Sequence, residues 1–156
     1  MDLYTLLKVV HVIGAAVLFG TGVGIAFFML MAHRTRDAAL VAHTATVVVV
    51  ADTIFTASAV VLQPVTGAGL ARLAGFPLFG GWMGLSLVLY IVTGVFWLPV
   101  VWMQLRMRNL AREAVHTGQP LPSAYFHLFR LWFEFGFPAF AAVVGIIWLM
   151  VAKPDL

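Results

Sequence analysis

Ionisable side chains that interrupt long apolar stretches are the first places to look for chemistry in this sequence. Five of them stand out: Lys8, His11, Asp52, Arg130 and Glu134. In apolar surroundings such a group is costly unless it pairs, faces a polar interior or lines a functional site. These residues are therefore the starting candidates for a site.

Lys8 and His11 are three residues apart, and at helical spacing they share a face with Ala15 and Gly22. Small side chains beside a histidine leave a slot flat enough for a porphyrin, and helix-bundle cytochromes use such a histidine as the axial iron ligand. We predict His11 as a metal ligand, with Lys8 beside it in the cofactor site. The alternative is a lysine that extends to a polar boundary next to a packed histidine.

Asp52 lies near the middle of the second apolar stretch and has no partner at helical spacing in its own segment. It is either a neutral hydrogen-bonding group or a group that handles protons. Its partner would be Lys8, Gln63 or a hydroxyl group on another helix. Asp52 and Gln63 are both predicted to be buried.

Arg130 and Glu134 are four residues apart in the last apolar stretch, a spacing at which the guanidinium and the carboxylate of one helix can meet. One interpretation is an ion pair that lowers the cost of placing both charges in apolar surroundings, with Glu134 buried. The other is that Arg130 holds an anionic group, such as a cofactor propionate.

Methionine and histidine form a second pattern, with Met29 and His33 four residues apart, as are Met103 and Met107. Thioether and imidazole ligands suit copper(I), although methionine at helical spacing is also typical of plain packing. The sequence contains no cysteine, which excludes disulfides, thiolate metal sites and iron–sulfur clusters.

Composition determines which elements must position these residues. Of 156 residues, 63% are hydrophobic and 10% are charged, against roughly 45–50% and about 25% in soluble domains. An ordinary soluble protein is excluded, and a net charge of +3 is too small and dispersed for nucleic-acid binding. The sequence predicts an all-α, polytopic membrane protein: a four-transmembrane-helix bundle forming a single transmembrane domain over 1–156, with spans at about 3–31, 40–63, 82–104 and 126–151.

The basic residues predict the orientation of this bundle. Six of the nine lie in or beside the first and third connections, and three lie at the opposite ends of the spans. By the positive-inside rule, both termini face outside, in the periplasm, and the protein is a multi-pass protein of a bacterial inner membrane. The Gly- and Pro-rich segment 64–81 is expected to form a loop on the membrane surface or folding back into it.

Each predicted span carries its polar residues on one face, which indicates one shared interior. The last of these faces contains His127, Arg130, Glu134, Pro138 and Gly145. Gly20 and Gly24 have a GxxxG spacing on another face of the first span, where they predict contact in a homo-oligomer or a larger membrane complex. The faces of the first three spans are: Lys8, His11, Ala15, Phe19, Gly22, Ala26, Met29 and His33; Asp52, Thr56, Ala59, Gln63 and Thr66; and Ser86, Tyr90, Thr93, Trp97 and Gln104.

Four segments, LLKVVHVIGAAVLFG, ADTIFTASAVVLQPVTG, GWMGLSLVLYIVTGVFWLPVVWMQLRMRNL and FHLFRLWFEFGFPAF, resemble a bacterial family of predicted integral membrane proteins of unknown function. The opening Lys-x-x-His and the glycine that follows are also distantly similar to the copper-resistance-D-like superfamily, which includes the HemJ-type protoporphyrinogen oxidases. That resemblance implies b-type haem. It places the Lys-x-x-His pattern on Lys8 and His11 and a second histidine on His33.

These patterns together predict a membrane protein that binds haem b between its helices. His11 is the candidate axial ligand, and the protein passes electrons or dehydrogenates a small membrane-associated substrate. His33 with His43 or His127 could instead ligate a haem in the cytoplasmic half. The alternative function is a non-catalytic membrane subunit or a copper-handling protein, and the sequence leaves open whether the protein is an enzyme.

Overall fold

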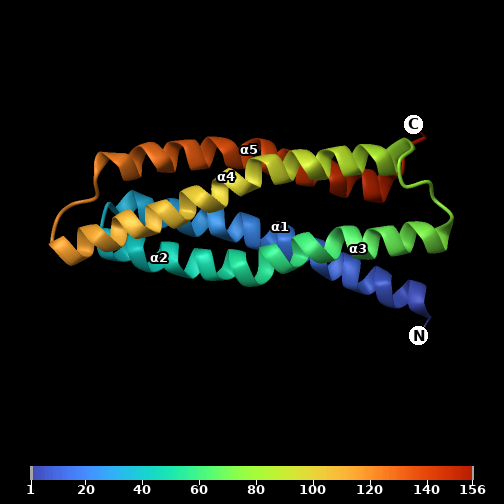
Figure 1. The fold of residues 1–156 in the computed structure, drawn as a ribbon, viewed down its shortest axis with the longest axis horizontal. Coiled ribbons are helices and arrows are strands. Elements are labelled where there is room, and N and C mark those ends of the chain that lie inside the picture. Colours follow the sequence, from blue (N-terminus) through green and yellow to red (C-terminus); the bar gives the residue numbers. More distant parts are fainter. Residues whose placement is uncertain (1, 156) are drawn as a thin grey trace.

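The computed structural model describes residues 2–155, which form four long helical runs connected by short turns (Figure 1). Each run has 30 to 37 residues and is apolar enough to cross a membrane. At ~1.5 Å per residue they measure roughly 45–55 Å, so their ends extend beyond a hydrocarbon core of ~30 Å. The predicted four-helix membrane bundle is confirmed. The elements are α1 (Leu3–Thr35), α2 (Ala38–Ala51), the π-helix η1 (Asp52–Thr56), α3 (Ala57–Ala74), α4 (Gly81–Thr117) and α5 (Ser123–Ala152).

The second span is longer than the sequence predicts, because α2, η1 and α3 form one continuous run. Only residues 75–80 of the predicted loop 64–81 form the connection: Pro64 lies inside α3, and the helix ends at Ala74, before Gly75 in the left-handed conformation. The third connection is likewise shorter, since α4 continues to Thr117. The prediction was wrong here because glycine and proline can both occur inside a membrane helix.

The α3 glycines bring this helix close to α1. A Cβ atom at Gly67 would lie 3.3 Å from Cε1 of His11, and one at Gly69 would lie 3.1 Å from Cδ1 of Leu7. Small residues allow membrane helices to approach closely in this way. The same glycines that suggested a loop therefore hold α3 against the helix that carries His11.

The bundle is tightly packed at one end and open at the other. At the end near the α1–α2 and α4–α5 turns, all four runs contribute to one buried core, which includes Met29, Val41, Met107 and Tyr125. Towards the termini, α3 packs on α1 while α4 packs on α5. Figure 1 shows these two pairs diverging towards the end where both termini lie. Two cavities lie between these helices.

Candidate functional site

Several polar side chains of the first three spans, among them His11, Asp52 and Gln104, line two adjoining cavities. The first, here the Asp52 cavity, has a volume of about 350 Å³ and lies between α1, η1, α4 and α5. The second, the His11 cavity, has a volume of about 470 Å³ and lies between the α1–α3 pair and the α4–α5 pair. Leu18, Thr93 and Trp97 line both.

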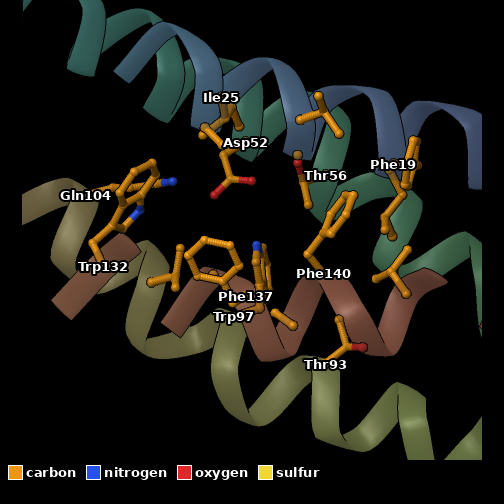
Figure 2. Close-up of a pocket in the computed structure, with 18 of the residues that line it drawn as sticks. Phe19, Ile25, Asp52, Thr56, Thr93, Trp97, Gln104, Trp132, Phe137 and Phe140 are labelled. Atoms are coloured by element: carbon orange, nitrogen blue, oxygen red, sulfur yellow. The ribbon is translucent and has the colours of Figure 1, made fainter. Parts of the chain in front are cut away.

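Asp52 points into its cavity from η1 (Figure 2), and only 5% of its surface is exposed. Most of the wall around it is apolar. Thr56, Thr93 and Gln104 also line the cavity. Figure 2 shows the indole nitrogen of Trp97 turned towards the carboxylate. Six aromatic side chains, including Trp97, form much of the wall: Phe19, Trp97, Trp132, Phe133, Phe137 and Phe140.

A chain of hydrogen bonds fixes one oxygen of Asp52 as an acceptor. The indole N–H of Trp132 can only donate, so the side-chain oxygen of Gln104 must accept from it, over 3.2 Å. The amide nitrogen of Gln104 then donates to Oδ2 of Asp52 over 3.1 Å. Asp52 is thus bound by Gln104, not by the Lys8 or Gln63 that the sequence suggested.

The last residue of the π-helix, Thr56, has a buried hydroxyl group without a hydrogen bond in the described chain. Seven other Ser and Thr hydroxyls, including that of Thr53 within η1, donate to the carbonyl four residues earlier: Thr46, Thr53, Ser58, Thr66, Ser86, Thr93 and Thr117. For Thr56 that carbonyl belongs to Asp52 and accepts the N–H of Ala57. Within residues 2–155, Oγ1 of Thr56 is the one buried side-chain oxygen or nitrogen without a hydrogen bond. A π-helix often marks a functional site, and this one presents an unused hydroxyl.

In the His11 cavity, a similar chain of hydrogen bonds fixes the tautomer of the histidine. The Thr66 hydroxyl donates its single proton to the carbonyl of Leu62, over 2.6 Å. It must therefore accept from Nδ1–H of His11, 2.8 Å away. The other ring nitrogen, Nε2, keeps its lone pair and has no hydrogen-bond partner in the described chain. A histidine held through one nitrogen with the other free is the arrangement found in metal sites.

Gln63 supports the same region from α3. Its side-chain amide donates to the main-chain carbonyl of His11 over 2.9 Å. The side chain is half-buried and lines the His11 cavity. Gln63 therefore positions α1 against α3 and has no direct contact with Asp52.

Tyr90 compensates for a proline on the opposite wall of the His11 cavity. Pro64 has no N–H, so the carbonyl of Val60, four residues earlier, lacks its usual donor. The hydroxyl of Tyr90 donates to that carbonyl. This bond joins α4 to α3, two helices that otherwise scarcely touch.

Three predicted site residues do not face the interior. Lys8, Arg130 and Glu134 are exposed, as is His127, so the inward face predicted for the last span is wrong. Arg130 and His127 lie within about two turns of the start of α5. A long helix reaches the polar headgroup region there, and a charged side chain in that region has a low free-energy cost. Glu134 lies one turn further along the same exposed side.

The true inward face of α5 is an aromatic stripe that polarity could not reveal. Tyr125, Phe129 and Trp132 are buried, four and three residues apart. The helix periodicity of these large rings is the signal that would have found them. Trp132 is a functional candidate missed at the sequence level, since it orients Gln104.

His33 lies in the tightly packed end of the bundle and outside both cavities. Its ring stacks on that of Phe129, with centroids 3.6 Å apart, and its Nδ1 lies 3.3 Å from the hydroxyl of Tyr125. His43 and His127 are both exposed, so neither forms an enclosed haem site with His33. Within residues 2–155, no group of three His, Asp or Glu side chains converges as a metal site. The methionines of the predicted copper pattern, Met29, Met103 and Met107, are buried in the core at this end.

Comparison with known proteins identifies a family but no characterised relative. A family model described as "Predicted integral membrane protein (DUF2269)" matches residues 5–154. No curated protein and no solved structure matches the chain.

Proposed function

We propose that this chain, which belongs to the DUF2269 family of predicted integral membrane proteins, holds haem b in the His11 cavity and transfers electrons within the membrane. The observation that carries the proposal is the geometry of His11. Its Nδ1 is bound by Thr66, its Nε2 is free, and the ring lines an apolar cavity of about 470 Å³. Such a volume falls within the ~300–1,000 Å³ usual for ligand pockets.

The residues present fit a haem with one protein ligand from histidine. His11 would bind the iron through Nε2, and Thr66 would keep the ring oriented, as outer hydrogen bonds do for metal ligands. Lys8, one turn nearer the end of the span, would lie close to the propionates at the polar boundary. Arg130 and His33 do not line this cavity, and His33 packs on Phe129 in the core at the other end of the bundle. Haem, when bound, supplies one-electron exchange.

The remaining wall keeps water away from that group. Leu18, Leu87 and Ile146 contribute apolar surface, and the Tyr90 hydroxyl is already committed to Val60. No second histidine lines the cavity in the described chain. His11 is therefore the one histidine of this lining that would hold the haem.

The orientation and assembly are part of the same proposal. The basic residues favour both termini in the periplasm of a bacterial inner membrane. The structure leaves space in front of Gly20, and only Phe28 of the same helix lies near Gly24. That open face supports contact with a second copy or with another membrane subunit.

An absorption spectrum tests the proposal directly. Protein purified from haem-sufficient cells should show a Soret band. His11→Ala should lose it, while His127→Ala, an exposed histidine at the other end, should keep it. Thr66→Val should weaken haem retention by about 10–100-fold, the usual effect of losing an outer hydrogen bond. Wild-type protein without a Soret band would exclude haem, and favour the non-catalytic subunit, or copper handling if metal analysis finds copper.

A further inference from the structure

The Asp52 cavity contains a negative group and no positive one. Among its lining residues, all within 2–155, Asp52 is the only ionisable side chain. A carboxyl group buried in apolar surroundings is stable only when a proton or a cation compensates it. Lys8 and Arg130 do not provide that cation, because both are exposed away from this cavity.

The groups around the carboxylate are arranged to stabilise a negative charge. Gln104 donates to Oδ2, and Trp132 orients Gln104 for this purpose. Oγ1 of Thr56 is buried, lines the same cavity and is bound to nothing. In a closed core, the polar groups around a buried carboxyl group are normally all hydrogen-bonded. Here a hydroxyl group without a hydrogen bond and a cavity of about 350 Å³ lie beside Asp52.

Aromatic rings surround this volume, and their faces attract cations. Six of the lining side chains are aromatic, contributed by α1, α4 and α5. The combination of one buried carboxylate with several rings suits a cation that also has apolar surface, because water is excluded from most of the wall. A small hydrated metal ion would find too few oxygen ligands here.

The wall of this cavity between α1 and α5 is loosely packed. Its α1 and α5 walls include Val23 and Phe137, which are 42% and 62% exposed. The rings of Phe19 and Phe140 contact each other across α1 and α5, with centroids 5.2 Å apart. Elsewhere these two helices have few contacts.

We propose that the Asp52 cavity is a binding site for a lipophilic organic cation, a quaternary or protonated ammonium that carries an aromatic or bulky apolar group. The cation enters sideways from the bilayer, its charge lies against Asp52, and its apolar part packs on the rings of Trp97 and Phe137. Haem at His11 is not required for this site.

Binding of phenyltrimethylammonium to the purified full chain tests the proposal, with tert-butylbenzene as the uncharged molecule of the same shape. Calorimetry and tryptophan fluorescence both report on binding, since Trp97 and Trp132 line the cavity. The cation should bind at least about tenfold more tightly than the hydrocarbon. Asp52→Asn, which keeps the shape of the side chain, should remove that preference. Glu134→Gln removes an exposed carboxylate that does not line the cavity, and it should leave binding unchanged.

A second variant keeps the test decisive if Asp52→Asn does not fold. Phe137 is 62% exposed, so Phe137→Leu should leave the fold intact and weaken cation binding by roughly two- to fivefold. Equal affinity for the cation and the hydrocarbon would overturn the proposal, as would a folded Asp52→Asn protein that binds the cation normally. Unchanged binding in Phe137→Leu would overturn the role of the rings. A missing Soret band would affect only the haem proposal.

Discussion

Replacing Tyr90 with phenylalanine should expose the cost of a proline inside a membrane helix. The ring stays in the cavity wall, but the hydroxyl that donates to the Val60 carbonyl is lost. Pro64 cannot provide a replacement N–H. The carbonyl of Val60, which is half-buried beside an apolar cavity, then has no donor in the protein.

The size of this effect follows from two known ranges. A buried polar group that loses its partner costs about 1–3 kcal/mol, whereas hydrogen bonds between membrane helices average about 0.6 kcal/mol and reach about 1.7 kcal/mol. Because Val60 is only half-buried, we expect Tyr90→Phe to lower the free energy of unfolding by about 1–1.5 kcal/mol.

A double-mutant cycle separates this explanation from a general packing effect. In Pro64→Ala the main-chain N–H of residue 64 can bond to the Val60 carbonyl within the helix, so the Tyr90 hydroxyl is no longer needed. Tyr90→Phe should then cost almost nothing, which gives a coupling energy of about 1 kcal/mol. Tyr4→Phe, which removes an exposed hydroxyl near the start of α1, is the matched control.

Equilibrium unfolding in mixed micelles with increasing dodecyl sulfate, followed by circular dichroism, measures all four proteins of the cycle. If Tyr90→Phe costs the same in both backgrounds, to within about 0.3 kcal/mol, then Tyr90 does not act by replacing the missing donor and the reasoning is wrong.

Two other predictions use the helix ends and the glycines. Gly84→Ala should destabilise the protein by more than about 1 kcal/mol in the same unfolding assay, because its Cβ would lie 2.8 Å from a main-chain carbonyl oxygen of the α3–α4 turn. Gly94→Ala, which meets nothing within 4 Å, should be neutral or stabilising by up to about 1 kcal/mol, and equal losses in both would contradict the clash. At the start of α1, the main-chain N–H of Thr5 donates to Asp2 and lowers the pKa of that carboxyl below its ordinary value. The cap should therefore persist above the unfolded pKa and be lost as the pH falls through the folded one, which the amide proton shift of Thr5 measures; loss on raising the pH would refute the assignment.

Polarity predicted the interior well where a polar residue lies deep in a span. Asp52 and Gln104 turn inward because lipid offers them no hydrogen bonds, and the helix repeat is enough to place them on one face. The same reasoning failed for Arg130 and Glu134, since these residues lie near a helix end where charge can reach polar surroundings. The inward face of α5 is aromatic, and an apolar side chain is equally stable against lipid or protein.

Pairings between helices were beyond the sequence. The sequence placed His11 and Thr66 on inward faces, but their hydrogen bond depends on how far α3 extends and how closely it approaches α1. That approach depends on Gly67 and on a helix that continues through Pro64. Neither the close approach nor the continuous helix can be predicted when proline and glycine are taken as signs that a helix ends.

Because of the π-helix at Asp52–Thr56, the site depends on the number of residues in this turn as well as on their types. Its wider turn holds one more residue than an α-helical turn would. Without that residue, everything after it would rotate by roughly 100° about the helix axis. Thr66 would then turn away from His11 while Asp52 kept its place. The five residues of the π-helix thus determine how the side chains of the two cavities are oriented relative to each other. Deleting any one of these residues would disturb the cavities more than a conservative substitution would.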